Sequence, residues 1–353
     1  MGVYIVLLGI ILLIACIPFK IDKIKCVIYF LILWAVSGLR YGIGTDYNNF
    51  SEMFYKIQSG AKVKEVEITF VYLNEFLGKY YKSSQVLFII TSLITISLIV
   101  KSIYDYSINR NLSIILFITL GYYQGSFNGF RQYIAIAICM YSIRYIFNKN
   151  LFKYIIAILI GSLFHSSALV FIPIYFVNKI KISKKVYMII LAIFIGVSNA
   201  YNFIIEILLP KISPYYFNKY SDSNFFSLGV NGKAEYIYFL CFLLILIISI
   251  FKIDIIRKID EKSQIYLNLC IISILFIALG FKSQLLFRIS LYFSIYFIFL
   301  IPTLIISFKV KLRPILYTLL SLFLMFFFFT VLISRDQVIP YKINESFVEE
   351  ILS

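Results

Sequence analysis

Apolar runs of about 17 to 25 residues recur along the chain, and short polar connections separate them. Each run is long enough to cross a hydrocarbon core of about 30 Å as a helix. We therefore expect about twelve transmembrane helices. They cover residues 2–19, 24–39, 84–101, 111–127, 129–147, 151–164, 167–178, 186–205, 234–251, 264–281, 286–307 and 314–333. The runs 151–164 and 167–178 are short for full crossings, so they could instead form a re-entrant pair or tilted helices with a buried hinge.

Composition agrees with a membrane protein. The 353 residues are 61% hydrophobic and only 14% charged, with a mean hydropathy of +0.93, whereas soluble domains carry about one quarter charged residues. The pattern therefore predicts an all-α polytopic protein that forms a single integral membrane domain over residues 1–353.

The net charge of +16 orients the helices and does not indicate nucleic-acid binding, because the Lys and Arg lie in short connections between apolar runs. The basic connections begin at Lys20, Lys101, Arg144, Lys179, Lys252 and Lys309, and the alternate connections are nearly free of them. Basic connections mark the cytoplasmic side. Both termini, including the tail 334–353, and the two long segments 40–83 and 206–233 are therefore predicted to lie outside.

The two long outer segments differ in character. In 40–83 the apolar residues fall at helical spacing among Lys and Glu, which predicts amphipathic helices on the outer interface. They are Phe50, Phe54, Ile57, Ile68, Tyr72, Leu73 and Phe76. Segment 206–233 is rich in Tyr and Phe, which suits either the headgroup boundary or stacking on sugar rings.

Polar groups at the ends of spans are the candidate functional residues, because a charge there is costly unless it meets a cavity or a partner. In residues 37–47, Arg40 is followed by two glycines, Gly42 and Gly44, that permit close backbone approach, and by Asp46. In residues 124–135 we expect Asn128 to cap a helix whose first turn holds Arg131 and Gln132. An anion at that helix start would satisfy both the helix dipole and Arg131.

Two further polar places map to the outer side. His165 is the one histidine of the chain, and Ser166 or Ser167 could orient its ring for proton transfer. Arg288 again puts a cation near the start of a helix. Each of Arg40, Arg131 and Arg288 could also be a snorkelling anchor.

The chemistry of this set suits an anionic lipid-linked substrate. Arginine forks bind phosphate and stabilise charge on a departing pyrophosphate, while Asp46 or His165 could take the proton from an attacking hydroxyl. The sequence does not choose between these two bases. It has no spacing for a metal site, no nucleotide-binding loop and no serine-hydrolase elbow, so we expect neither a metal nor a cofactor.

The chain resembles the EpsG family of bacterial exopolysaccharide proteins, which is close to the Wzy-type polysaccharide polymerases. The resemblance rests on an ordered set of motifs: Gly38 to Tyr47, Glu67 ahead of an apolar helix, Asn128 to Ala135 with Gln132 after Arg131, and His165 to Ala168. The loop 206–233 and the tail after Ser334 take no role from it.

The resemblance implies a GT-C-like glycosyltransferase on the outer face of a bacterial cytoplasmic membrane. It would join undecaprenyl-diphosphate-linked oligosaccharide repeat units, as both donor and acceptor, into capsular or exopolysaccharide. Arg40, Arg131 and Arg288 would bind the pyrophosphate, Asp46 or His165 would act in catalysis, and Glu67, Asn128, Gln132 and Ser166 would support them. Partners could include membrane lipid, a chain-length regulator and a flippase.

Two other functions remain open from the sequence. A flippase for the same lipid-linked sugars would also have about a dozen helices, but a transporter should show related halves and charges near mid-membrane. Here the charges gather at outer ends and no half-repeat is visible. A ligase that uses the same carrier would differ from a polymerase only in its acceptor, which the sequence does not show.

Overall fold

Helices make up nearly all of the regular structure in the computed structural model, which describes residues 1–18, 22–61, 63, 66–177, 182–199, 207, 209–212, 233–334, 338–345 and 347. In this described part no strand occurs, and one isolated antiparallel bridge joins Arg40 to Ile343. The all-α prediction is confirmed. The chain divides into two compact units, residues 1–172 with 318–353, and residues 173–317. The single domain expected from the sequence stays a prediction.

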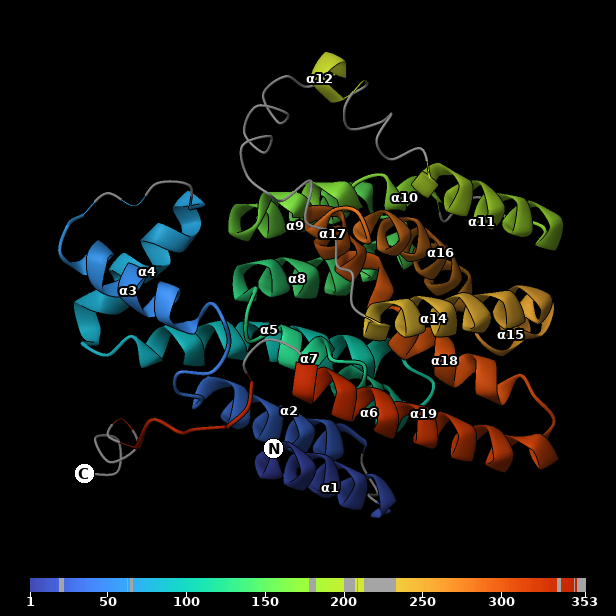
Figure 1. Ribbon diagram of the computed structural model, residues 1–353, viewed down its shortest axis with the longest axis horizontal. Helices are drawn as coiled ribbons and strands as arrows, with labels where there is room; N and C mark the ends of the chain where they lie inside the picture. Colours follow the sequence, from blue (N-terminus) through green and yellow to red (C-terminus); the bar gives the residue numbers. More distant parts are fainter. Residues whose placement is uncertain are drawn as a thin grey trace. The chain divides into compact units, whose positions relative to one another are not determined.

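The first unit carries the sequence motifs, and its helices run side by side (Figure 1). They are α1 (Gly2–Cys16), α2 (Asp22–Gly38), α3 (Tyr47–Gln58), α4 (Ile68–Tyr80), α5 (Gln85–Tyr106), α6 (Arg110–Thr119), α7 (Tyr122–Gly125), α8 (Phe130–Phe147), α9 (Leu151–Phe164) and the 3-10 turn η1 (Ser166–Phe171). Most of α19 (Arg313–Ser334) also belongs to this unit.

The second unit holds α10 (Ile174–Val177), α11 (Lys184–Asn199), α12 (Leu209–Ile212), α14 (Lys233–Phe251), α15 (Ile253–Ile259), α16 (Ser263–Gly280), α17 (Gln284–Ser294), α18 (Phe297–Ile306) and the 3-10 turn η3 (Val310–Leu312). Helix α16 is largely buried and packs against α11, α14, α17 and α18. Gly280 lets α17 approach closely, because a Cβ there would lie 2.8 Å from the Cβ of Phe287.

Among the described residues, three helices are long and apolar enough to cross a membrane: Gln85–Tyr106, Ser263–Gly280 and Val310–Thr330. Two bent helix pairs raise this number to five if each pair is one span. Shorter apolar helices occur as well, and α9 with its 14 residues extends only about 21 Å. The count of about twelve spans is therefore not confirmed and stays a prediction.

Two predicted spans are broken. The run 111–127 divides into α6 and α7 because Gly121 adopts a φ of 81°, a left-handed conformation that ends a helix. The run 286–307 divides into α17 and α18, which are bent by 47°. The run 167–178 also departs from one helix, since η1 and α10 replace it as far as the described residues extend. Apolar periodicity predicted helix in each place and could not locate the breaks.

Two antiparallel pairs determine which chain ends meet in the first unit. Gly38 at the end of α2 lies against Ile89 near the start of α5, where an added Cβ would come within 3.3 Å of the Ile89 Cα. Gly161 near the end of α9 similarly faces the Ala135 carbonyl of α8, 3.6 Å from an added Cβ. The end of α2 therefore lies beside the start of α5, and the end of α9 lies beside the start of α8.

The segment 40–83 forms two helices, as predicted, and Figure 1 shows α3 and α4 side by side. Helix α3 buries Phe50, Phe54 and Ile57, which confirms its predicted apolar face. Helix α4 does not pack its predicted stripe against protein, and the contact of that stripe with the outer interface stays a prediction. Its buried positions are Phe70, Asn74 and Leu77, whereas three residues of the expected stripe are exposed. They are Ile68, Tyr72 and Phe76.

The side of α4 that packs against protein was not predicted, for a physical reason. The helix is apolar on more than one side, so its periodicity does not determine which side meets protein. The buried side joins an aromatic cluster in which Phe50, Phe70 and Phe88 surround Phe130, with ring centroids 4.0, 5.6 and 5.9 Å from it. This cluster attaches α3 and α4 to the starts of α5 and α8.

Candidate active site

A buried amide, Gln85 at the start of α5, connects the elements that carry the motifs. Its Nε2 donates to the Gly38 carbonyl at 2.6 Å and to the Arg40 carbonyl at 3.1 Å. Its Oε1 accepts from the Tyr47 hydroxyl at 3.2 Å and from Asn344 Nδ2 at 3.0 Å. We call Gln85 the amide hub. It joins α2, α3, α5 and the C-terminal segment, and a single polar residue at the start of an apolar run was its only sequence signal.

Arg40 is a buried cation, with 1% of its surface exposed. Its Nη1 donates to the Ser37 carbonyl and to Ser92 Oγ, the latter at 3.3 Å, and its Nη2 donates to the Phe127 carbonyl at 3.2 Å. The guanidinium also lies over the rings of Phe88 and Phe127, 5.1 and 4.9 Å from their centroids. Arg40 therefore ties the end of α2 to α5 and to the loop before α8.

The groups that accept hydrogen bonds from Arg40 are all neutral. No salt bridge to it occurs among the described residues, and its Nε has no hydrogen-bond partner. Burial lowers the pKa of Arg40 to about 10. The side chain therefore stays protonated at neutral pH and places a positive charge behind the 124–129 loop.

That loop contains two buried amides without partners. Neither side-chain polar atom of Gln124 or of Asn128 makes a hydrogen bond within the described part of the chain. Asn128 lies against Gly44, where an added Cβ would be 2.3 Å from its Oδ1. Gly44 also has a φ of 100°, so only glycine fits this approach without strain. Buried amides that lack partners are rare in native proteins and mark places where water or a ligand binds.

The prediction that Asn128 caps α8 is wrong. The helix begins at Phe130 with Gly129 in the cap position, and the Phe130 amide instead donates to the Asn128 carbonyl at 2.8 Å. The intervening turn explains why the helix starts one residue later than expected. The prediction that Arg131 and Gln132 lie in the first turn is confirmed.

Arg131 is the more accessible cation of the first unit's motifs, with 20% of its side chain exposed. Its guanidinium forms a salt bridge with Glu67, the residue at the cap position of α4. It also lies over Phe50 and Phe70, 5.6 and 5.5 Å from the ring centroids. Glu67 thus supplies an anion to a cation that the dipole of α8 disfavours.

His165 follows α9 in extended conformation and begins η1. Its Nδ1 accepts from the Ser167 backbone amide at 3.4 Å and lies 2.7 Å from Ser167 Oγ. Of the two serines considered from sequence, Ser167 therefore holds the ring, while Ser166 is exposed. An amide donating to Nδ1 favours the neutral tautomer that carries its proton on Nε2.

Asp46 occupies the cap position of α3, one helical turn before Phe50, and is half-buried. Phe50, whose ring lies beneath Arg131, belongs to the same helix α3. Asp46 therefore starts the helix that supports this cation. The register of α8 and α9 set by Gly161 brings His165 alongside the first turn of α8. Glu67 and Phe50 therefore meet Arg131 at the start of α8, where Gln132 lies as a buried side chain. That Asp46 and His165 act at the same place stays a prediction.

Arg288 belongs to the second unit, where it lies one turn inside α17 and is exposed. Most of the predicted aromatic loop 206–233 lies outside the described residues. Within the part that the structure describes, no group of three His, Cys, Asp or Glu side chains could hold a metal ion.

The C-terminal segment is a part of the site that sequence reasoning missed. The Tyr41 amide donates to the Lys342 carbonyl at 2.9 Å, and the Asn344 amide donates to the Leu39 carbonyl at 3.3 Å. The Tyr341 hydroxyl donates to the Val36 carbonyl at 2.7 Å. Residues 338–344 therefore lie along the Arg40 motif like a strap. A single pair of residues in a bridge leaves no periodic signal in a sequence.

Comparison with known proteins agrees with the motif reading. The model of the EpsG family matches residues 23–343, which begin in α2 and end at the bridge partner of Arg40. No curated protein and no solved structure matches the chain.

Proposed function

The chain belongs to the EpsG family, and from this membership we propose that it polymerises undecaprenyl-diphosphate-linked oligosaccharide repeat units on the outer face of a bacterial cytoplasmic membrane. The family and the apolar helices make it a membrane protein with a polysaccharide polymerase role. The lipid carrier, the outer face as the place of the reaction, and the residue roles are proposed.

The observation that carries the proposal is the position of Arg131. It is a partly exposed guanidinium in the first turn of α8, held over two aromatic rings and beside Glu67. A guanidinium can exchange a carboxylate for a phosphate, since both accept its paired N–H groups. The backbone amides of the helix start favour the same anion.

In this mechanism the acceptor repeat offers a hydroxyl to the anomeric carbon of the growing chain. A new C–O bond forms while the bond between that carbon and the diphosphate oxygen breaks, and the departing undecaprenyl diphosphate takes the electron pair. Arg131 binds and neutralises this diphosphate. The same role expected for Arg288, which lies in the second unit, stays a prediction. Arg40 adds a buried positive charge and holds the 124–129 loop in place.

The hydroxyl proton passes to Asp46 or His165. In the tautomer favoured by Ser167, His165 presents a proton on Nε2 and not a lone pair. This arrangement suits Asp46 as the base and His165 as a hydrogen-bond donor to the sugar or the diphosphate. Gln124 and Asn128 offer donors and acceptors that fit sugar hydroxyls, because each amide carries both.

The test uses purified protein and synthetic undecaprenyl-diphosphate repeat units, with no metal or nucleotide added, and resolves products as a ladder. Asp46→Asn should abolish lengthening if Asp46 is the base, whereas His165→Ala should leave a slow ladder. A slow ladder in Asp46→Asn together with none in His165→Ala reverses the two roles. No ladder from wild type, together with carrier flipping in liposomes, refutes the polymerase and supports a flippase. Transfer of the glycan only to an unrelated acceptor supports a ligase.

A further inference from the structure

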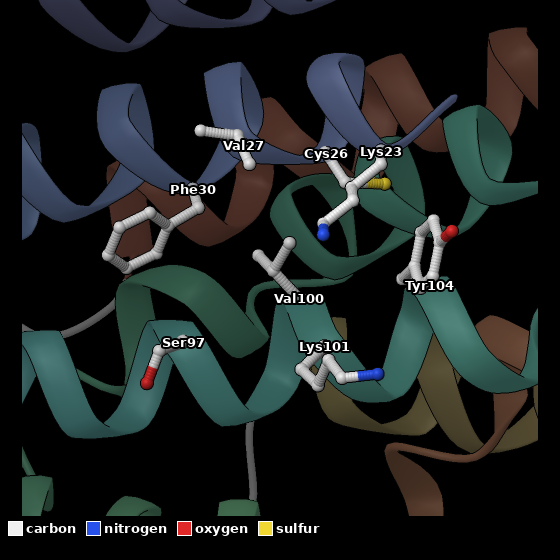
Figure 2. A pocket seen from close by; sticks show the side chains of 8 residues that line it. All are labelled: Lys23, Cys26, Val27, Phe30, Ser97, Val100, Lys101 and Tyr104. Carbon is white, nitrogen blue, oxygen red and sulfur yellow. The ribbon is translucent and has the colours of Figure 1, made fainter. Parts of the chain in front are cut away.

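A groove between α2 and α5 lies at the opposite end of the first unit from Arg40, and it encloses about 340 Å³. It is lined by Lys23, Cys26, Val27, Phe30, Ser97, Val100, Lys101 and Tyr104 (Figure 2). This volume lies within the range of about 300–1,000 Å³ that is usual for ligand sites. None of these residues takes part in the proposed polymerase chemistry.

The groove has one charged end and one apolar end. Figure 2 shows Lys23, Lys101 and Tyr104 together, with Phe30 and Ser97 at the other end. Phe30 follows Lys23 by seven residues on α2, so the two ends lie about 10 Å apart along the helix. The antiparallel course of α5 gives the same order. The lining therefore changes from cationic to apolar over a length that matches the part of an acyl chain next to a lipid headgroup.

The charged end carries a surplus positive charge. Lys101 is paired with Asp105, 2.5 Å from its Nζ, and Arg110 is paired with Asp22. Lys23 is exposed, and it forms no salt bridge with any residue that the structure describes. An ammonium at the mouth of an apolar groove is complementary to a ligand with an anionic head and a hydrocarbon tail.

We propose that this groove binds an anionic glycerophospholipid. Its phosphodiester lies between Lys23 and Lys101, and one acyl chain lies along Val27, Phe30 and Val100. The end with Lys23 and Lys101 is the predicted cytoplasmic side, where anionic headgroups attract basic side chains. A peptide would leave its backbone groups without partners along the apolar lining, and free phosphate would not use that lining.

Delipidated full-length protein would be titrated with phosphatidylglycerol and phosphatidylcholine and followed by native mass spectrometry. Phosphatidylglycerol should bind more tightly, and Lys23→Ala with Lys101→Ala should weaken it by about 25-fold, about five-fold for each ammonium. Asp105→Asn should tighten binding because it releases Lys101 from its ion pair. Lys56→Ala, which removes an exposed lysine from α3, is the matched control and should bind as wild type.

Location is tested with phosphatidylglycerol that carries a photoreactive diazirine in its acyl chain. Crosslinks should map to α2 and α5, and Val27→Trp should remove them by filling the groove. Val27 is 47% exposed, so the larger side chain does not disturb a core. Equal binding of both lipids, unchanged affinity in the double lysine variant, or displacement by undecaprenyl phosphate at lower concentration would each overturn the proposal. Polymer ladders made by the same variants show separately whether these variants are folded.

Discussion

Replacing Arg131 separates a structural role from a role in binding the diphosphate. The salt bridge with Glu67 is partly exposed, at 20% and 22% for the two side chains, so it is worth at most about 1 kcal/mol. The two ring contacts with Phe50 and Phe70 add about 0.5–1 kcal/mol each. We therefore expect Arg131→Ala to lower the free energy of unfolding by about 2–3 kcal/mol.

The effect on rate should be larger than this stability change suggests. A group that stabilises developing charge contributes about 100- to 1,000-fold to a rate, so Arg131→Ala should slow polymerisation by at least about 100-fold. Glu67→Gln removes the ion pair but leaves the guanidinium in place, and we expect it to change the rate by less than about five-fold. Arg131→Lys keeps the charge without the planar fork and should fall between them.

Initial rates of ladder formation at saturating substrate, with thermal unfolding of the same samples, measure both effects. Arg144→Ala is the matched control, because Arg144 lies at the other end of α8 over Tyr141 and Tyr145, 4.7 and 5.9 Å from their centroids. It should lose similar stability and keep its rate. Equal rate losses in Arg131→Ala and Glu67→Gln would refute the reasoning, since the pair would then matter only as a structural contact.

Three further predictions follow from the contacts of the first unit. Gly44→Ala should destabilise the protein by more than about 2 kcal/mol, because it adds a clash with the Asn128 amide to the cost of a positive φ. Gly42 has a φ of 63° and open space where a Cβ would be added, so Gly42→Ala should cost only about 1–2 kcal/mol. Thermal unfolding measures both changes. Asn344→Ala should cost about 1–2 kcal/mol by freeing one acceptor of the amide hub, and it should speed hydrogen exchange in residues 338–344; unchanged exchange would argue against the strap. Ser167→Ala should lower the ladder rate about ten-fold or less and shift its pH profile, since the ring of His165 loses its contact with the Ser167 hydroxyl. An unshifted profile would separate His165 from proton transfer.

The sequence predicted most helices of the first unit for a clear reason. Apolar periodicity and basic connections act over many residues, so they give a signal that single substitutions cannot remove. The pairing of Arg131 with Glu67 was not predicted, although both residues were named. Sixty-four positions separate them, and such a contact exists only after α4 packs on the starts of α5 and α8.

The missed features share a different cause. The amide hub and the strap depend on single hydrogen bonds between distant residues, and the breaks at Gly121 and after Ser294 depend on one or two backbone angles. The side of α4 that packs against protein was not predicted, because a membrane-surface helix can be apolar toward lipid as well as toward protein. In a membrane protein, apolar periodicity shows that one side of a helix meets an apolar surface, but it does not show whether that surface is lipid or protein.

The three arginines looked alike in sequence, and the structure gives Arg40 a distinct position. A buried cation among neutral groups is unfavourable unless its bonds are needed, so its forked contacts to the carbonyls of Ser37 and Phe127 should matter for holding the 124–129 loop. Arg40→Lys keeps a charge but cannot reach both carbonyls, and we expect it to cost about 2 kcal/mol of stability. Its kcat should fall with little change in KM for the repeat unit, because the change disturbs the loop and removes no contact with the substrate. Ser92→Ala removes only the 3.3 Å contact and should be nearly silent. A raised KM with an unchanged kcat in Arg40→Lys would instead place this guanidinium on the substrate and contradict the loop-holding role.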